Sequence, residues 1–363
     1  MKQIKGLDTL RAFSVLFVIV DHFGVSFDDT SPSGSFIKNV IIPNGGFGVM
    51  LFFVLSGFLI TSILLNAKET DQNKISIIKT FFLRRALRIF PIYYLLCIIL
   101  YIANYPEFRH MIGWYITYCA NFYIFSHNEW GNLGHTWSLD VEEQFYLIWP
   151  WLIVFVPNKY LAYIFSAFVL VGLSTTWYAI EVQHHFAAVL MPHFLSAFGL
   201  GGMLAWSKQD SKWDVVFFKI TNILAMPSIV IYFYMRTVRN GVFSGLFWYN
   251  TVIILIVTWI IALVLNNKSK RISKYLLENR VLNYIGKISY GVYLYHAVYI
   301  NGYCNPVNKW IYINTLQWPA FNKFVHDHHT DYYIQLSIMF GIAALSYHFI
   351  EKPILKLKDK FAY

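Results

Sequence analysis

Apolar stretches of about 20 residues recur along the chain, and short polar segments separate them. A helix of this length crosses the hydrocarbon core of a bilayer. Ten such stretches are present, at residues 11–26, 46–66, 89–104, 138–157, 160–180, 188–206, 215–235, 247–265, 284–303 and 332–351. The pattern predicts an all-α, polytopic membrane protein with about ten transmembrane helices, built as a single domain over residues 1–363.

An eleventh apolar stretch, residues 111–125, is short and rich in Tyr and Asn. Cytoplasmic loops carry an excess of Lys and Arg. If residues 111–125 do not cross the membrane, all the basic clusters of the chain fall on one side. If they cross, the later clusters fall on the opposite side. We therefore expect a non-crossing extracytoplasmic or re-entrant helix around 111–125, within an excursion of residues 105–137, and both termini in the cytoplasm.

Composition supports the membrane interpretation and narrows the partners. The chain is 57% hydrophobic and only 13% charged, which excludes a soluble domain of this size. The net charge of +10 comes from Lys and Arg clustered between apolar stretches, so membrane topology explains it better than nucleic acid does. Three widely spaced cysteines form no CxxC pair. We expect membrane lipids as partners, no nucleic acid and no metal.

Two ionisable residues stand within the first apolar stretch. Arg11 and His22 are eleven residues apart, about 20° from three full helical turns and about 16 Å along the axis, so they share one helix face. Asp21 is rotated by about 100° from His22 and is not its obvious partner. Ionisable groups in a span usually face a protein interior or a water-filled cavity. The alternative is that Arg11 is a snorkelling anchor and His22 a boundary residue.

The segment "FFLRRALRIFPIYY" (81–94) places three arginines just before the third predicted span. Arg84, Arg85 and Arg88 are spaced so that they project from adjoining faces of one helical turn. Guanidinium groups bind phosphates with two parallel hydrogen bonds, so the three could converge on an anion. The alternative is the general cytoplasmic excess of positive charge, which would predict Lys as readily as Arg.

The segment "LGHTWSLDVEEQFYLIWP" (133–150) begins the fourth predicted span with several acids. The helix dipole stabilises acids at a helix start, but it accounts poorly for Glu142 and Glu143 inside an aromatic, apolar span. One of them could accept the N–H of His22 or act as an acid or base itself. Ser138 is a candidate N-cap, and His135 is a lesser candidate for the site.

Further candidates for substrate binding are Tyr293 and His296 in "KISYGVYLYHAV" (287–298), together with Glu143 and Trp137. Packing or an interfacial aromatic belt is the alternative for the aromatic residues.

Six motifs in order resemble the membrane-bound acyltransferase family 3, the O-acetyltransferases of bacterial surface polysaccharides. They are Arg11 and His22 with ten residues between them, "FGVMLFFVLSGFLI", Arg85 and Arg88 running into "IFPIYY", "WSLDVEEQFYLIWP", "SYGVYLYH" and the terminal "FIEKP". The resemblance covers essentially the whole chain. It is to the stand-alone type of this family, which has no extra extracytoplasmic domain. It implies that an acyl group moves from cytoplasmic acyl-CoA, most often acetyl-CoA, to a sugar hydroxyl outside the cytoplasmic leaflet.

The resemblance places Arg11, His22, Arg85, Arg88 and Glu142 at the motif positions. We expect His22 to be the general base, oriented or tuned by Glu142, with the CoA phosphates near Arg85 and Arg88 and with Arg11 lining the same channel. A covalent acyl-histidine route stays open.

The expected location is the bacterial cytoplasmic (inner) membrane, and the expected acceptor is a lipid-linked or surface polysaccharide such as the O-antigen of lipopolysaccharide. The sugar, the hydroxyl position and the length of the acyl group stay open. A transporter or flippase of a lipid-linked sugar is the alternative, because intramembrane charges also line substrate pathways. Such a protein would normally show repeat symmetry, which this sequence lacks.

Overall fold

The computed structural model describes residues 6–23, 36, 40–70, 72–182, 184–237, 244–266, 273–319, 321–322 and 328–361. Within these ranges every regular element is helical and no strand occurs, which confirms the all-α prediction. The longer helices are α1 (Leu7–His22), α3 (Gly45–Lys68), α4 (Lys74–Ile102), α7 (Trp137–Phe155), α8 (Asn158–Glu181), α9 (Met191–Ser207), α10 (Ser211–Thr237), α11 (Ser244–Asn266), α13 (Arg280–Val298) and α16 (His328–Ser346). The shorter ones are α5 (Phe108–Ile116), α6 (Ala120–His127), η2 (Gly134–Thr136), η3 (His185–Val189), η4 (Ser273–Leu277), η5 (Tyr299–Tyr303), α14 (Cys304–Thr315), η6 (Tyr347–Glu351), α17 (Lys352–Lys356) and η7 (Leu357–Lys360).

Six stretches of the described helices are long and apolar enough to cross a membrane, so the chain is a membrane protein. They are residues Gly45–Lys68, Lys74–Ile102, Asn158–Glu181, Ser211–Thr237, Trp248–Asn266 and Thr330–Lys356. The other four predicted spans correspond to α1, α7, α9 and α13. Of these, α1 has 16 residues and α9 has 17, while α7 carries three acids. Ten crossings therefore stay a prediction.

The excursion between α4 and α7 contains two helices where the sequence predicts one around 111–125. The helix breaks because Tyr118 has a left-handed backbone, with φ of 55°. Its amide donates to the carbonyl of Tyr115 at 3.1 Å, and the amide of Cys119 donates to Trp114 at 2.9 Å, the pattern that ends many helices. With nine residues in α5 and eight in α6, each helix is about half as long as a crossing needs.

Helix α4 starts well before the apolar run that predicted it. The side chain of Asn73 caps it by accepting from the amide of Ile75 at 2.9 Å. The helix then continues to Ile102, so the helical turn predicted for Arg84, Arg85 and Arg88 lies in its interior. A continuous helix fixes the directions of the three side chains.

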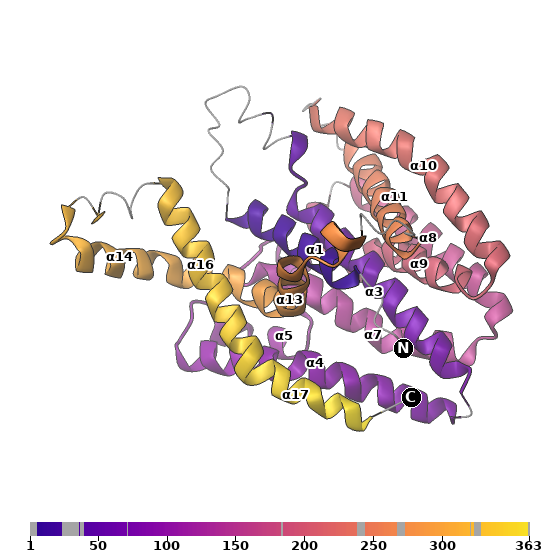
Figure 1. Ribbon diagram of the computed structural model, residues 1–363, viewed down its shortest axis with the longest axis horizontal. Helices are drawn as coiled ribbons and strands as arrows, with labels where there is room; N and C mark the ends of the chain where they lie inside the picture. The colour runs from indigo at the N-terminus through magenta and orange to yellow at the C-terminus, as the bar shows by residue number, and fades with distance from the viewer. Residues whose placement is uncertain are drawn as a thin grey trace.

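Helix α1 packs between α3 and α13, and glycines permit both contacts (Figure 1). A Cβ atom on Gly48 of α3 would lie 2.3 Å from the carbonyl oxygen of Ser14. A Cβ atom on Gly286 of α13 would lie 1.9 Å from the carbonyl oxygen of Asp8. Small residues allow helix backbones to approach this closely in lipid. The two contacts fix the face that α1 turns to α13.

The remaining central helices are joined by aromatic side chains. Phe145 of α7 stacks on Phe198 of α9, with centroids 3.9 Å apart, and the indole of Trp149 donates to Thr61 of α3 at 2.8 Å. Helices α8 to α11 gather on one side of the molecule, and α14 extends on the opposite side (Figure 1). The central helices α1, α3, α4, α7 and α13 provide the walls of the site.

Candidate active site

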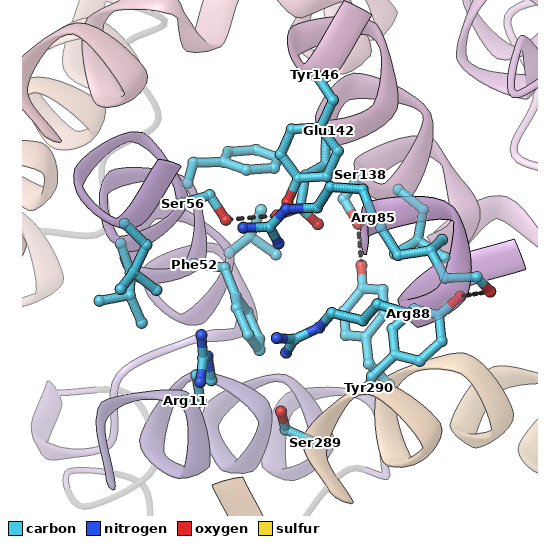
Figure 2. Close-up of a pocket in the computed structure, with 17 residues that line it drawn as sticks. Arg11, Phe52, Ser56, Arg85, Arg88, Ser138, Glu142, Tyr146, Ser289 and Tyr290 are labelled. Atoms are coloured by element: carbon cyan, nitrogen blue, oxygen red, sulfur yellow. Dashed lines mark hydrogen bonds between the residues drawn. The ribbon is translucent and has the colours of Figure 1, made fainter. Parts of the chain in front are cut away.

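A cavity lies between α1, α3, α4, α7 and α13 and encloses about 770 Å³ of empty space, open solvent included (Figure 2). Polar and apolar side chains both contribute to its walls: Arg11, Val49, Phe52, Phe53, Leu55, Ser56, Leu59, Arg85, Arg88, Ile89, Ser138, Leu139, Glu142, Tyr146, Ser289, Tyr290 and Tyr293. Residues far apart in the sequence therefore meet around one space.

The guanidinium groups of Arg11, Arg85 and Arg88 point into this cavity (Figure 2). Arg11 pairs with Asp8 at 2.8 Å. Arg85 lies over the ring of Tyr146, with its guanidinium carbon 5.1 Å from the centroid. Within the described part of the chain, neither Arg85 nor Arg88 forms an ion pair. Three guanidinium groups thus share the cavity with one lining acid, Glu142, and this excess of positive charge favours an anionic ligand.

Arg84 turns away from the cavity, although the sequence groups it with Arg85 and Arg88. Its guanidinium donates to the backbone carbonyl of Phe361 and lies 3.5 Å from that of Lys358. Helix rotation places Arg84 about 100° from Arg85 but only about 40° from Arg88, so the carbonyls of the C-terminal segment, and not its position on the helix, account for its direction. Arg84 therefore binds the C-terminal segment of the chain, and the expectation that all three arginines converge on one anion is wrong for this residue.

Lys358 lies close enough to the arginines to interact with their charges. Burial lowers the pKa of this amine to about 6, and the positive charges of Arg88, Arg85, Arg84 and Arg11 contribute in that order. The position lies in η7, outside the candidate spans. The lowered pKa thus has two causes, burial first and the neighbouring guanidinium charges second.

The carboxylate of Glu142 also lines the cavity, on the same side as Arg85, which lies over the ring of Tyr146. Its Oε1 accepts from the hydroxyl of Ser56 at 2.5 Å and from the hydroxyl of Tyr146, one helical turn further along α7. Figure 2 shows these groups together. The neighbouring Glu143 does not line the cavity, and its Oε1 is buried without a hydrogen-bond partner. The two acids, adjacent in the sequence, therefore have different surroundings.

Three histidines form a cluster directly beyond the cavity. His22 Nδ1 lies 2.8 Å from His296 Nε2, and the ring of His135 meets that of His296 at a centroid distance of 4.9 Å and an angle of 75°. His296 is fully buried and His135 nearly so, whereas His22 is exposed at the end of α1. Burial lowers the pKa of His135 to about 4, so it is neutral at physiological pH.

Tyr293 connects the cavity to this cluster. Its ring lines the cavity, and its hydroxyl group bonds to Ser138 and donates to the backbone carbonyl of His135 at 3.1 Å. Its own backbone carbonyl lies 2.5 Å from Nδ1 of His296. One residue of α13 is therefore in contact with both parts of the site.

The structure brings most of the sequence candidates together. Arg11, Arg85, Arg88, Glu142 and Tyr293 line one cavity. His22 and His296 form the adjoining cluster. The partner of His22 is His296, and the hydrogen-bond partners of Glu142 are Ser56 and Tyr146, so no direct bond joins His22 to Glu142.

Trp137 lies outside the cavity, where it stacks on Phe194 at a centroid distance of 5.2 Å. Ser138 is not an N-cap, because α7 begins at Trp137 and the hydroxyl of Ser138 bonds to Tyr293.

Sequence reasoning missed several polar residues of the cavity. Tyr146 follows Glu142 by four residues, a spacing that places both on one helix face. Ser289 precedes Tyr293 by four residues and has the same relation to it. Ser56 is one of three hydroxyl residues in the apolar helix α3, with Thr61 and Ser62. Its contact with Glu142 depends on tertiary structure and leaves no pattern in the sequence.

Among the described residues, no group of three or more His, Cys, Asp or Glu side chains has the arrangement of a metal site. The reactive groups of the site are the imidazole, carboxylate and guanidinium side chains described above.

Comparisons with known proteins agree on one kind of enzyme. Residues 4–326 match the family model of an acyltransferase domain. The chain is 30% identical over 394 residues to "Putative O-acetyltransferase SACOL0978" of Staphylococcus aureus (strain COL), which covers 98% of this chain and 58% of that protein. It is 29% identical over 387 residues, with the same coverage, to "O-acetyltransferase OatA" of Staphylococcus aureus (strain NCTC 8325 / PS 47). The chain therefore spans less than two thirds of the length of these relatives. No solved structure matches it.

Proposed function

The chain belongs to the acyltransferase domain family and is an acyltransferase, and from this premise we propose that it transfers an acetyl group from acetyl-CoA to a hydroxyl of an extracytoplasmic polysaccharide sugar. The names of its relatives support O-acetyl transfer. The observation that carries the proposal is a cavity that holds Arg85, Arg88 and Glu142 and adjoins the histidine cluster; within the described residues the two arginines form no ion pair.

Acetyl-CoA fits the distribution of charge in the cavity. Its phosphates would be bound by Arg85 and Arg88, with Lys358 nearby. The pantetheine arm would follow the apolar wall formed by Phe52, Leu55 and Leu59, which directs the thioester toward Tyr293. Arg11 would contact pantetheine or phosphate groups from α1. This arrangement holds the donor by its charged end and leaves the acetyl group at the histidine side.

The chemistry requires a base for the acceptor hydroxyl. In the direct route, the neutral imidazole of His22 takes the hydroxyl proton while the oxygen attacks the thioester carbonyl. The new C–O bond forms and the C–S bond breaks. The CoA thiolate leaves and receives the proton from the imidazolium. Contacts with Ser56 and Tyr146 hold the carboxylate of Glu142 in place. From there it would interact electrostatically with the arginines and with the bound donor.

The acceptor would approach from the exposed side of His22, because His296 covers its other side. We place this side outside the cytoplasmic leaflet and the arginine side in the cytoplasm of a bacterial inner membrane. The O-antigen of lipopolysaccharide is one example of such a polysaccharide. A lipid-linked precursor is a second form that the same geometry would accept.

The test uses membranes that contain the protein, acetyl-CoA labelled in the acetyl group and a surface polysaccharide acceptor. We expect label in the polysaccharide with the native chain and none with His22→Ala of equal abundance. Label incorporated equally by His22→Ala would remove His22 from the mechanism. No incorporation together with movement of unlabelled acceptor across the membrane would support a transporter instead. Label retained on the protein when acceptor is omitted, and lost in His22→Ala, would show the covalent route.

A further inference from the structure

The hydrogen bonds around His296 determine which nitrogen atoms carry protons. Nδ1 of His296 lies 2.5 Å from the backbone carbonyl of Tyr293. A carbonyl oxygen can only accept, so Nδ1 must be the protonated nitrogen. In a neutral imidazole the other nitrogen then carries a lone pair. Nε2 of His296 is thus an acceptor, and it faces Nδ1 of His22 at 2.8 Å.

The same reasoning assigns the proton of His22. Because Nε2 of His296 accepts, Nδ1 of His22 must donate, and the lone pair of a neutral His22 is on Nε2. The ring planes differ by only 22° while the centroids are 5.0 Å apart. With the two nitrogens in hydrogen-bond contact, this is an edge-to-edge arrangement, in which the N–H bond points along the in-plane lone pair.

The surroundings favour the neutral form of His296. The side chain is fully buried, and the titratable side chains that meet its ring are His22, His135 and Tyr293. None of these supplies a negative counter-charge, and burying an unpaired imidazolium is costly. His135 has no charge to offer either, since its Nε2 binds the backbone carbonyl of Leu294 at 3.2 Å and its pKa is low.

We propose that His296 is a positioning residue: it holds His22 with the proton on Nδ1, so that Nε2 of His22 is the atom that removes the proton of the acceptor hydroxyl. This inference rests on the proposed function of His22 as the base. The backbone carbonyl of Tyr293 anchors the arrangement, since it fixes the proton of His296. An orienting group of this kind keeps the base in the correct tautomer and stabilises its charged form during reaction.

Two substitutions at one position test the role of the acceptor atom. In His296→Gln, the amide oxygen can replace Nε2 as the acceptor for His22. In His296→Leu, the acceptor is lost at similar volume. We expect kcat for acetyl transfer to fall roughly 10²- to 10⁴-fold in His296→Leu with an unchanged KM for acetyl-CoA. We expect His296→Gln to recover kcat to within about tenfold of the native value.

A matched control is available at His193, which is also buried and hydrogen-bonded but lies on α9, where it contacts Thr176. His193→Leu should keep the native kcat, which separates loss of a buried imidazole from loss of this one. Equal kcat in His296→Leu and the native enzyme would overturn the proposal, as would equal losses in His296→Gln and His296→Leu in protein that retains its KM for acetyl-CoA.

A measurement without turnover separates this inference from the proposed function. In protein labelled with ¹⁵N-histidine, the resonances lost in His22→Ala should belong to a ring with protonated Nδ1 and bare Nε2. The same resonances should change in His296→Leu and persist in His193→Leu. A protonated Nε2 on His22 would refute the positioning role even if His22 proves essential. If the native protein shows the expected tautomer but His22→Ala stays active, the positioning role stands and the proposed function of His22 is refuted.

Discussion

Arg11 and His22 are eleven residues apart on α1, and both face α13. Arg11 shares the cavity with Ser289, whereas His22 bonds to His296, almost two helical turns further along α13. Tyr293 lies between Ser289 and His296 on the same helix and contacts both the cavity and the histidine cluster. Helices α1 and α13 together therefore connect the arginine-lined cavity to the histidine cluster.

Removing one arginine charge should weaken donor binding specifically. We expect Arg88→Gln to raise the KM for acetyl-CoA roughly 10- to 100-fold, because one charge-assisted contact to phosphate is lost. The KM for acetyl-pantetheine, which has no phosphate, should not change. Arg109→Ala, an exposed arginine of α5, is the control. Equal effects on both donors would show that Arg88 has a structural role.

Glu142 and Glu143 offer an internal comparison of neighbouring acids. Glu142→Gln keeps an acceptor for Ser56 and Tyr146 but removes the negative charge from the cavity wall. We expect kcat to fall roughly 10²- to 10⁴-fold. Glu143→Gln should retain most activity, because Glu143 lies outside the cavity. A larger loss in Glu143→Gln than in Glu142→Gln, measured at equal protein abundance, would reverse this assignment.

CoA binding should be coupled to proton uptake. In the free protein the pKa of Lys358 is about 6, below its ordinary value, because of burial and of the nearby arginine charges. Bound phosphates raise this pKa, so near neutral pH the amine gains a proton on binding. Affinity should therefore rise as the pH falls from above neutrality toward about 6 and level off below it.

Calorimetric titration of the protein with CoA, in buffers of different ionisation enthalpy, measures the uptake directly. Lys358→Met should abolish the uptake, whereas substitution of the exposed Lys352 by Met should not. Identical proton uptake in native protein and Lys358→Met would assign the linkage to another group.

The crossing of α1 and α13 should be sensitive to a single methyl group. Gly286→Ala places a Cβ atom 1.9 Å from the Asp8 carbonyl, so the helices must separate. Overpacking of this kind costs about 1–3 kcal/mol. We expect a lower temperature of unfolding in detergent and lower activity. Gly341→Ala in α16 meets no atom within 4 Å and should be neutral or slightly stabilising. Equal unfolding temperatures of the two variants would contradict the close approach.

The sequence predicted the elements of the site better than their partners. Periodicity placed Arg11 and His22 on one face of α1, and i,i+3 spacing placed Arg85 and Arg88 together, because both depend only on local helix geometry. The break at Tyr118 was missed, since a left-handed residue other than Gly or Asn has no clear signal.

The partner of His22 was also missed. His22 and His296 are 274 residues apart, so their contact follows from the packing of α1 on α13, which no local pattern encodes. Arg84 was grouped with Arg85 and Arg88 for a similar reason. Local spacing gives no information about the C-terminal segment, whose carbonyl at Phe361 binds its guanidinium group.

The chain of hydrogen bonds from His22 through His296 ends at the backbone carbonyl of Tyr293. No replacement of the side chain at position 293 can delete that carbonyl, so the phenolic oxygen and the main-chain oxygen of Tyr293 are separable in function. Deleting only the phenol oxygen would disconnect Ser138 and η2 while the imidazole pair stays aligned. Natural variation at this position can therefore change the wall of the cavity without changing the hydrogen bond between the two histidines.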